Sequence, residues 1–437
     1  MDKTDRLRDY GLAFLLYEQG LGVCGYELIR ELFIFVKLIL NSYLKNRFFL
    51  FALLSICATI LTCANSMIKI VPIFFILIIM FQYYIGYKRR FSVSKFPKRV
   101  FTLYCCYCLF LVLKAVLFDS NAGLKGDFIT SFFGNLEFGV LSFSIPCCAL
   151  VVYERNWIAT SMKVCDMIAV FGVLVGIAYI GGANIRYFTF LLYFLPFICF
   201  RLIIRYEHKI LYWVYFFFSL YYCAMEDERS ILVLDLVVLI ALHTMLLYSH
   251  KLITKSIKLY CIIVPLVGAF LTFYNLFNKE SFFEYMYTMY SGETTMVNDT
   301  RTFLFQELSE DLSETSTWLY GKGMFGTYYS NVMYVASKNG EIADNSNRLG
   351  TECGYLWLIL KGGIIYFVLY FTLFYTTVVV AIRRNQQIFL FIAFLISSRL
   401  LFMFVSFTPA FDIANIFLWA MLGLTMAREE LITNKSN

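Results

Sequence analysis

The sequence predicts an all-α fold, a polytopic integral membrane protein with about twelve transmembrane helices and one large outer loop. Two observations predict this fold class. Of the 437 residues, 60% are hydrophobic and only 15% are charged, and 47 Phe and 32 Tyr exceed what a water-facing surface needs. Long apolar stretches also recur along the chain. A soluble multidomain chain, a disordered chain and a disulfide-stapled chain are therefore excluded.

The first 47 residues are expected to form a cytoplasmic and interfacial segment. Within residues 26–45, charged and polar side chains fall on one side of a helix and apolar side chains on the other. This pattern is typical of a helix that lies in the membrane interface rather than across it. The charges that precede any long apolar run argue against a cleavable signal peptide.

The apolar stretches that follow are each long enough for a helix of roughly 20 residues, which crosses roughly 30 Å of hydrocarbon. Spans one to nine occupy residues 48–278, and spans ten to twelve occupy residues 354–427, before a cytoplasmic tail at 428–437. The expected spans lie near residues 48–64, 68–87, 100–118, 129–152, 157–180, 188–204, 210–225, 230–248, 259–278, 354–379, 386–406 and 411–427.

Lys and Arg side chains gather in alternate connections, and this asymmetry predicts the orientation. With both termini in the cytoplasm, the inner connections hold the basic clusters at 88–99, 201–209 and 251–258, whereas the short outer connections carry few basic residues. The connection at 279–353 is then on the outer side. It has roughly 75 residues, and a loop of that length in a compact protein is usually functional.

A surface helix is predicted inside the outer loop. Residues 298–300 (Asn-Asp-Thr) have side chains suited to a helix N-cap. From Arg301 onward, Leu304, Leu308 and Leu312 repeat at intervals of four, opposite a run of acidic residues. This spacing predicts an amphipathic helix of about 14 residues that lies over the membrane surface.

Four arginines lie in or beside the predicted spans on the outer side: Arg186, Arg229, Arg301 and Arg399. Charge within hydrocarbon is costly, so these residues are candidates for function. Because Arg makes planar, bidentate bonds to phosphate, several converging arginines would suit a lipid-linked pyrophosphate. Each also has a structural alternative: Arg186 could reach the headgroups, Arg229 could pair with a neighbouring Glu, and the other two could be a loop charge and a buried structural charge.

Further polar residues fall within four of the predicted spans. Their scatter, without a shared depth, favours cavity lining or buried pairing over a proton or ion path. These residues are Lys114, Asn135, Glu137, Asp166 and Asp235.

The sequence leads us to expect neither a metal nor a cofactor. The acidic run at 226–228 would need further oxygen ligands from elsewhere in the chain. The 13 Cys and three His show no spacing typical of zinc or iron sites, and residues 321–323 (Gly-Lys-Gly) lack the spacing of a P-loop. The net charge of +7 is spread over small clusters, so nucleic acid is not an expected partner.

Three motifs occur in order in the second half of the chain. Residues 228–232 (Glu-Arg-Ser-Ile-Leu) enter a predicted span, and the long outer loop then carries Arg301 at the head of its helix and 318–323 (Trp-Leu-Tyr-Gly-Lys-Gly) after it. Residues 352–356 (Glu-Cys-Gly-Tyr-Leu), followed by 361–363 (Lys-Gly-Gly), open the next span. In this order and topology the motifs resemble the O-antigen polymerase and ligase superfamily of bacterial membrane glycosyltransferases, whose first motif is of the Ser-Arg-Ser type.

The resemblance covers roughly residues 210–410. It implies a GT-C-like, metal-independent polysaccharide polymerase in the bacterial inner membrane, with the long loop in the periplasm. The enzyme would transfer a polyprenyl-pyrophosphate-linked glycan chain onto a new lipid-linked repeat unit. Its partners would be the lipid bilayer, the polyprenyl-pyrophosphate-linked oligosaccharide and a chain-length regulator protein.

One departure from the family pattern favours a polymerase over a ligase. Ligases of this superfamily carry a His three residues before the Tyr or Phe of the third motif, and this chain has Glu352 there, three residues before Tyr355. An O-antigen ligase and a lipid-linked oligosaccharide flippase or transporter are the alternatives. A transporter would be expected to show inverted or parallel repeats, and none is evident in the sequence.

The resemblance and the residue chemistry together suggest catalytic roles. Arg229 and Arg301 would stabilise the negative charge that builds on the departing pyrophosphate. Glu352 would take the proton of the attacking hydroxyl, aided by partial burial at the junction of loop and membrane. The candidates for substrate binding are Arg399, Arg186, Lys322 and Tyr355.

Overall fold

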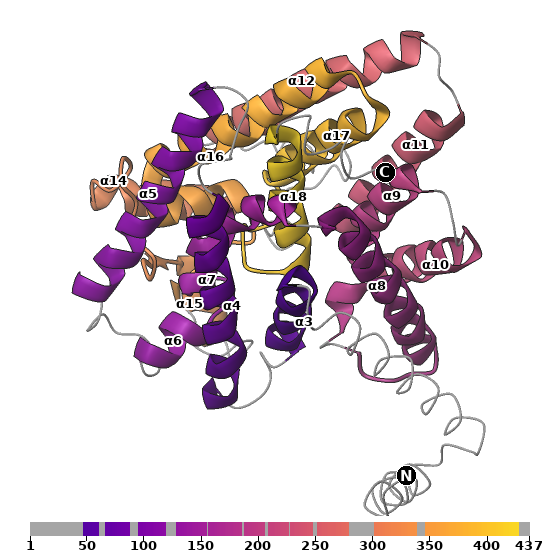
Figure 1. Cartoon of the computed structure of the whole chain (residues 1–437). Coiled ribbons are helices and arrows are strands. Elements are labelled where there is room, and N and C mark those ends of the chain that lie inside the picture. Colours follow the sequence, from indigo (N-terminus) through magenta and orange to yellow (C-terminus); the bar gives the residue numbers. More distant parts are fainter. Residues whose placement is uncertain are drawn as a thin grey trace, which may run out of the picture. The chain divides into compact units, whose positions relative to one another are not determined.

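The structure of the chain is a computed structural model, and it is mostly helical (Figure 1). The chain divides into two compact units, Met1–Phe51 and Ala52–Asn437. The predicted interfacial helix at 26–45, the expected cap at 298–300 and the tail at 428–437 lie outside the described residues. The structure describes residues 47–60, 66–87, 95–118, 128–154, 156–185, 188–205, 209–226, 228–247, 251–278, 301–338 and 346–427.

Helices precede and follow the 279–353 connection in the order of elements. The described elements before the loop are α3 (Arg47–Ile60), α4 (Ser66–Tyr87), α5 (Lys95–Phe118), α6 (Phe128–Gly134), α7 (Val140–Ser144), η2 (Ile145–Tyr153), α8 (Trp157–Ile180), η3 (Thr189–Leu191), α9 (Leu195–Ile204), α10 (Lys209–Met225), α11 (Arg229–Leu247) and α12 (Lys251–Phe277). The later elements are α14 (Thr302–Glu314), β1 (Tyr328–Tyr329), α15 (Asn331–Lys338), β2 (Asn347–Arg348), α16 (Gly354–Arg384), α17 (Gln387–Phe402) and α18 (Ile413–Met426).

Among the described residues, five helices are long and apolar enough to cross a membrane: α5, α8, α11, α12 and α16. Seven shorter apolar segments accompany them, and each predicted span overlaps one of these helices. The shorter segments are Arg47–Thr59, Val71–Tyr87, Val140–Tyr153, Thr189–Ile204, Ile210–Met225, Gln387–Phe402 and Ile413–Met426. The lengths and the composition are those of a membrane protein.

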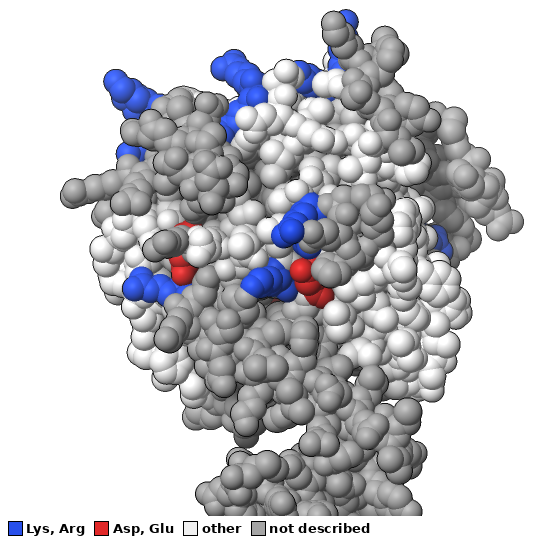
Figure 2. Space-filling model, turned by 45° about the vertical axis from the view of Figure 1, so that its right-hand side comes forward, with Lys and Arg blue, Asp and Glu red and all other residues white. Residues whose placement is uncertain are grey.

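Charged side chains are sparse on the face drawn in Figure 2. Lys and Arg gather at its upper edge and again at about half its height, and uncharged surface separates the two groups. Large apolar side chains on α5 and α10 are exposed, including Phe118 at 76% and Ile210 at 82%. Large apolar side chains exposed on such helices are typical of a surface that faces hydrocarbon.

The predicted span at 129–152 is not one continuous helix. α6 ends at Gly134, a polar turn follows at 135–139, and α7 runs directly into the 3-10 helix η2. Asn135 Oδ1 accepts hydrogen bonds from the backbone N–H groups of Glu137 and Phe138, each at 2.8 Å. The prediction of an uninterrupted span is wrong here because this side chain bonds the backbone locally and competes with helical hydrogen bonding.

The helix predicted within the 279–353 connection is confirmed as α14. Leu304, Leu308 and Leu312 are fully buried, as their spacing predicts. Phe305 is buried as well, and its ring centre lies 5.7 Å from that of Phe404. The residue at the N-cap position is Arg301, whose side chain makes no capping hydrogen bond.

α16 is broken near its start, and the loop after α14 fills the break. Gly363 has φ +67°, which interrupts the helical backbone hydrogen bonds. The N–H of Lys322 donates to the carbonyl of Leu360 (2.8 Å), and the N–H of Ile364 donates to the carbonyl of Trp318 (2.9 Å). A side chain at Gly363 would lie 2.3 Å from the carbonyl oxygen of Leu319, so only glycine fits. The two Gly-containing motifs of the sequence therefore form one interlocked structure.

A two-stranded sheet and a buried lysine fix the segment before α16. β1 and β2 pair in antiparallel fashion with Tyr328 opposite Arg348. Lys361 is fully buried, and its Nζ donates to the carbonyl oxygens of Gly326 at 3.0 Å and Leu349 at 2.5 Å. These hydrogen bonds join the two ends of the loop and position Arg348.

The connection 403–412 between α17 and α18 is held by backbone hydrogen bonds from other elements. The N–H of Gly354 donates to the carbonyl of Ser406 at 3.1 Å, and the carbonyl of Leu136 accepts from the N–H of Phe411 at 2.8 Å. The connection thus lies between the start of α16 and the α6–α7 turn, and it brings three polar segments together.

Candidate functional site

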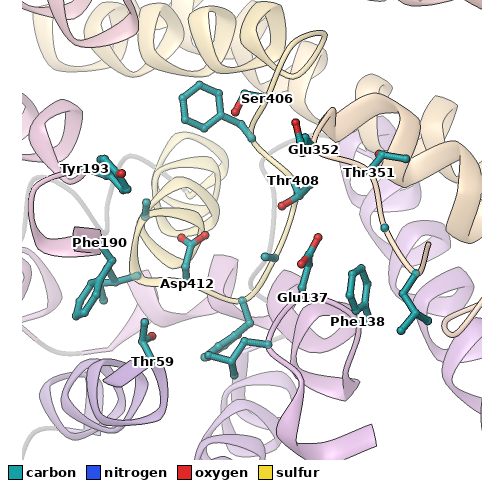
Figure 3. A pocket seen from close by; sticks show the side chains of 18 of the residues that line it. Thr59, Glu137, Phe138, Phe190, Tyr193, Thr351, Glu352, Ser406, Thr408 and Asp412 are labelled. Carbon is teal, nitrogen blue, oxygen red and sulfur yellow. The ribbon is translucent and has the colours of Figure 1, made fainter. Parts of the chain in front are cut away.

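A cavity of about 790 Å³ lies where these segments meet. Its walls come from the α6–α7 turn, residues 347–352, the end of α17, the connection 403–412 and the start of α18. Figure 3 shows Glu137, Glu352 and Asp412 around this cavity, with the carboxylates of Glu137 and Asp412 directed into it. The remaining polar side chains of the lining are those of Thr59, Tyr193, Asn347, Arg348, Thr351, Arg399, Ser406 and Thr408.

Arg399 lies in the last turn of α17, since the helix ends at Phe402 rather than extending to residue 406 as predicted. A positive charge is favoured at that end of a helix by the helix dipole. Its Nη2 donates to Asn415 Oδ1 at 3.3 Å, and its Cζ lies 3.8 Å from the centre of the Phe407 ring. The guanidinium group of Arg399 lines the cavity, and these two contacts hold the group in place.

Asp412 caps α18 and places a negative charge near Arg399. Its Oδ1 accepts from the N–H of Asn415 at 2.6 Å, and its Oδ2 accepts from Asn415 Nδ2 at 2.8 Å. Arg399 lies close enough for the two opposite charges to interact. The pair is thus an oppositely charged couple on one wall of the cavity.

Arg348 supplies a second guanidinium. Its Nη2 lies 3.6 Å from Glu352 Oε1, and its side chain is only 12% exposed. Its Nη1 is buried and has no hydrogen-bond partner within the part of the chain that the structure describes. The Glu352 side chain is 60% exposed, so the expected partial burial of this carboxylate is wrong. The reason is its place in the loop before Cys353, the N-cap of α16, which leaves its side chain open to solvent.

Glu137 is the carboxylate of the α6–α7 turn. The positive charges of Lys361 and Arg348 lie close enough to interact with its carboxylate. The interior polar residues were expected to line cavities or to form buried pairs. Glu137 lines the cavity, and Asp166, whose side chain is 31% exposed, pairs with the buried Arg201 at 3.1 Å.

Two of the predicted site residues, Glu352 and Arg399, line the cavity together. Arg301 does not line it, but its Nε donates to the carbonyl of Val405 at 3.1 Å and so supports the connection 403–412 from another side. Arg186 lies outside the described residues.

The other predicted site residues lie away from the cavity lining. Arg229 is exposed at the start of α11, next to Glu228, which accepts a hydrogen bond from the cavity-lining Tyr193 at 3.4 Å. Lys322 forms an ion pair with Asp311 of α14. Tyr355 is fully buried, with its ring 5.2 Å from that of Phe367, because it lies on the inward face of the first turn of α16.

Sequence reasoning missed Arg348 and Asp412. Asp412 has a local signal, since an Asp directly before an apolar run is typical of a helix N-cap. Arg348 has none, because its position depends on the pairing of β2 with β1 and on the ties made by Lys361. Long-range pairing of short strands leaves no periodic pattern in a sequence.

Comparison with known proteins gave no match to a family model, to a curated protein or to a solved structure. The chemistry of the site therefore has to be argued from its residues.

Two guanidinium groups and three carboxylates in one cavity can bind a large, polar, partly anionic molecule. The arginines offer planar donors to a phosphate group, and the Thr and Ser hydroxyls can orient sugar hydroxyls. Within the described ranges, no three His, Cys, Asp or Glu side chains come together as a metal site. The groups present suit transfer reactions that rely on fixed charges and a proton acceptor.

Proposed function

We propose that this protein is a membrane glycosyltransferase that polymerises polysaccharide repeat units of the O-antigen or capsule type. It transfers a polyprenyl-pyrophosphate-linked glycan chain onto a lipid-linked repeat unit. The observation that carries the proposal is the cavity itself, which brings Arg399 and Arg348 together with three carboxylates beside long apolar helices. The substrate has a hydrocarbon tail, a charged pyrophosphate and a polyhydroxyl glycan. Apolar helices, arginines and polar side chains with carboxylates would contact these three parts in turn.

The division of charge within the cavity supports the same reaction. When the bond between sugar and pyrophosphate breaks, negative charge grows on the departing oxygen, and a preorganised donor there typically contributes about 3–4 kcal/mol. Arg399 and Arg348 are the cations of the lining. The hydroxyl of the acceptor sugar must lose a proton in the same step, and the carboxylates of the lining are the groups that can accept it.

The proposal includes twelve crossings of the bacterial inner membrane, with both termini in the cytoplasm and the 279–353 loop in the periplasm. Single Cys residues placed at Ser309 and at Ser94 in a Cys-depleted variant test this topology. An impermeant thiol reagent should label them from opposite sides of the membrane. Labelling from the same side would contradict the topology and the location of the site.

The function is tested by the surface polysaccharide of cells that lack this protein. A polymerase leaves a single repeat unit on the lipid anchor and removes the long chains from the gel ladder. Loss of every repeat unit from the anchor would indicate a ligase instead, and an unchanged ladder would exclude both activities.

A further inference from the structure

The three carboxylates that line the cavity have different surroundings. Glu137, Glu352 and Asp412 are chemically alike, and any of them has a side chain capable of accepting a proton. A general base, however, needs an oxygen that the substrate can reach and that is not already required to hold the protein together. The contacts of each carboxylate therefore decide between them.

Asp412 is committed to the structure. Both of its carboxylate oxygens accept hydrogen bonds from Asn415, and together they cap α18. Protonation would weaken the cap and the couple with Arg399 at the same time. A group that must stay ionised to keep the end of a helix in place is poorly suited to take up a proton in each turnover.

Glu352 contacts Arg348, but unlike Asp412 it does not cap a helix. Its carboxylate lies 3.6 Å from Arg348 and its side chain is 60% exposed. Water solvates such a carboxylate, and one of its oxygens already faces the Arg348 guanidinium, so it is less available to a bound substrate than an unpaired carboxylate inside the cavity. Its contact suggests instead that Glu352 orients Arg348.

Glu137 has its backbone fixed and its carboxylate available. Asn135 Oδ1 accepts from its N–H, and the neighbouring Leu136 carbonyl accepts from Ser142 Oγ at 2.5 Å and from the N–H of Phe411. Its carboxylate accepts no hydrogen bond from the residues that the structure describes, and it is directed into the cavity (Figure 3). A rigid turn thus presents an uncommitted oxygen to a bound molecule.

Gly350 limits where the Glu137 side chain can lie. A Cβ atom at Gly350 would be 3.1 Å from Glu137 Oε1 and 2.5 Å from the ring of Phe138. The backbone of the segment before α16 therefore passes directly over this carboxylate. That close approach restricts the position of the carboxylate within the cavity.

We propose that Glu137 is the catalytic base that takes the proton of the acceptor hydroxyl, an inference that rests on the proposed glycan transfer. The hydroxyl oxygen bonds to the anomeric carbon of the donor sugar as the bond from that carbon to the pyrophosphate breaks. The hydroxyl proton passes to a Glu137 carboxylate oxygen. The electron pair of the broken bond leaves with the pyrophosphate, whose charge faces Arg399 and Arg348.

The test compares Glu137→Gln with Glu352→Gln in the purified full-length protein in detergent. The substrate is the lipid-linked repeat unit extracted from cells of the same organism that lack this protein. Glu137→Gln should lower turnover by about 10²–10⁴-fold, the usual effect of removing a general base. It should leave binding of the repeat unit, measured by native mass spectrometry, unchanged.

Formate tests the role more specifically than loss of activity does. In Glu137→Ala the cavity gains room for a small carboxylate, so added formate should restore part of the turnover, whereas formamide, a neutral molecule of similar size, should not.

The outcomes separate the inference from the proposed function. If the unmodified protein forms no polymer from the repeat unit, the proposed function fails. If it forms polymer and Glu137→Gln does so at a similar rate, or if formate leaves Glu137→Ala inactive, the assignment of the base is overturned while the polymerase function stands.

Discussion

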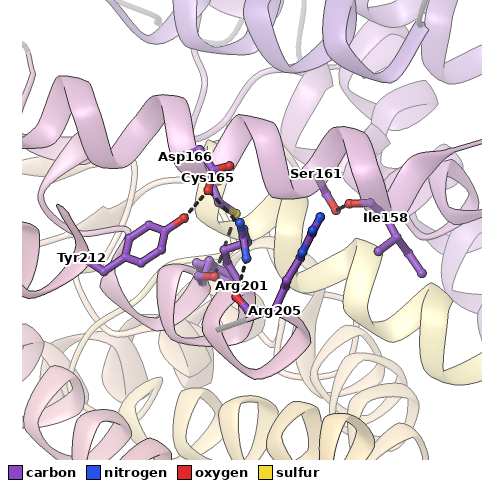
Figure 4. A network of polar contacts seen from close by, with 8 residues as sticks. Ile158, Ser161, Cys165, Asp166, Arg201, Arg205 and Tyr212 are labelled. Atoms are coloured by element: carbon purple, nitrogen blue, oxygen red, sulfur yellow. Dashed lines mark hydrogen bonds and ion pairs between the residues drawn. The ribbon is translucent and has the colours of Figure 1, made fainter. Parts of the chain in front are cut away.

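Arg201 and Arg399 are both arginines near the end of an apolar helix, and their surroundings differ. Arg201 of α9 is 3% exposed; its Nε bonds to Asp166 Oδ1 at 3.1 Å, and its Nη1 donates to the carbonyl of Arg205 (Figure 4). Tyr212 donates to the same Asp166 oxygen. Arg399 has one hydrogen bond, to Asn415, and a ring contact among the described residues, and it lines the cavity.

The partners of the two guanidinium groups distinguish a structural arginine from one that can bind a ligand. At Arg201 the donors are directed to groups of the protein, so the ion pair joins α8, α9 and α10. At Arg399 the guanidinium borders a cavity in which a ligand can use its remaining donors. Residue type and hydropathy are the same in both cases, so only the partners distinguish them.

The largest expected effect is the contrast between Arg399→Lys and Arg201→Lys. Lysine keeps the charge but loses the planar fork. Arg399→Lys should reduce polymer formation by more than about 100-fold, the effect of losing one preorganised donor, with the melting temperature nearly unchanged. Arg201→Lys should lower the free energy of unfolding by about 1–3 kcal/mol, with turnover per folded molecule near normal. Activity assays and thermal denaturation in detergent measure both. If Arg399→Lys and Arg201→Lys had equal effects on turnover and equal effects on stability, the two arginines would not differ in role.

Asp412→Asn should have the next largest effect, because it changes a residue that serves both purposes. Asn caps a helix about as well as Asp, but the change removes the second oxygen, which accepts from Asn415 Nδ2, and leaves Arg399 without its negative neighbour. We expect an activity loss of about tenfold together with a lower melting temperature. The matched control is Asp166→Asn, which should lower the melting temperature but leave turnover per folded molecule intact. A loss of turnover in Asp166→Asn alone would contradict the assignment.

Arg301→Lys should be milder than Arg399→Lys. Arg301 contacts the connection 403–412 through the carbonyl of Val405 and is not part of the cavity lining. Losing that hydrogen bond should cost about 1 kcal/mol and reduce turnover about fivefold, through altered positioning. Arg229→Lys, at an exposed position, should change turnover by less than about twofold. A loss from Arg229→Lys as large as that from Arg399→Lys would place a second phosphate contact at the start of α11.

The smallest expected effect is that of Glu352→Gln. Its carboxylate is exposed and paired with Arg348, and exposed pairs contribute about 0–1 kcal/mol. Turnover should fall by less than about fivefold, since glutamine can still contact the guanidinium. A loss of about 100-fold or more, as expected of a general base, would return the role of proton acceptor to Glu352.

The sequence predicts the helices well because their signal is local. The leucine spacing after Arg301 predicts α14, and all three leucines are buried. Apolar length predicts each helical span, except where Asn135 turns the chain and divides 129–152. Local periodicity cannot predict that turn, because a single side-chain oxygen decides between helix and turn.

The site is less predictable because it depends on contacts between distant segments. Glu352 and Arg399 could be chosen from their unusual position beside apolar helices. Arg348 reaches the cavity only through strand pairing, and Glu137 faces it only because the α6–α7 turn meets the connection 403–412. None of these contacts has a periodic signature, so the sequence alone suggests candidate residues but not which of them share a cavity.

The central claim is that the cavity around Arg399 joins glycan chains carried on lipid pyrophosphates. The most direct test supplies the purified protein in detergent with lipid-linked repeat units and follows product length on a gel. We expect a ladder of polymers with the unmodified protein and none with Arg399→Lys, in the absence of any bilayer to cross. A protein that binds the repeat unit yet returns it unchanged, with no longer product, would contradict the claim.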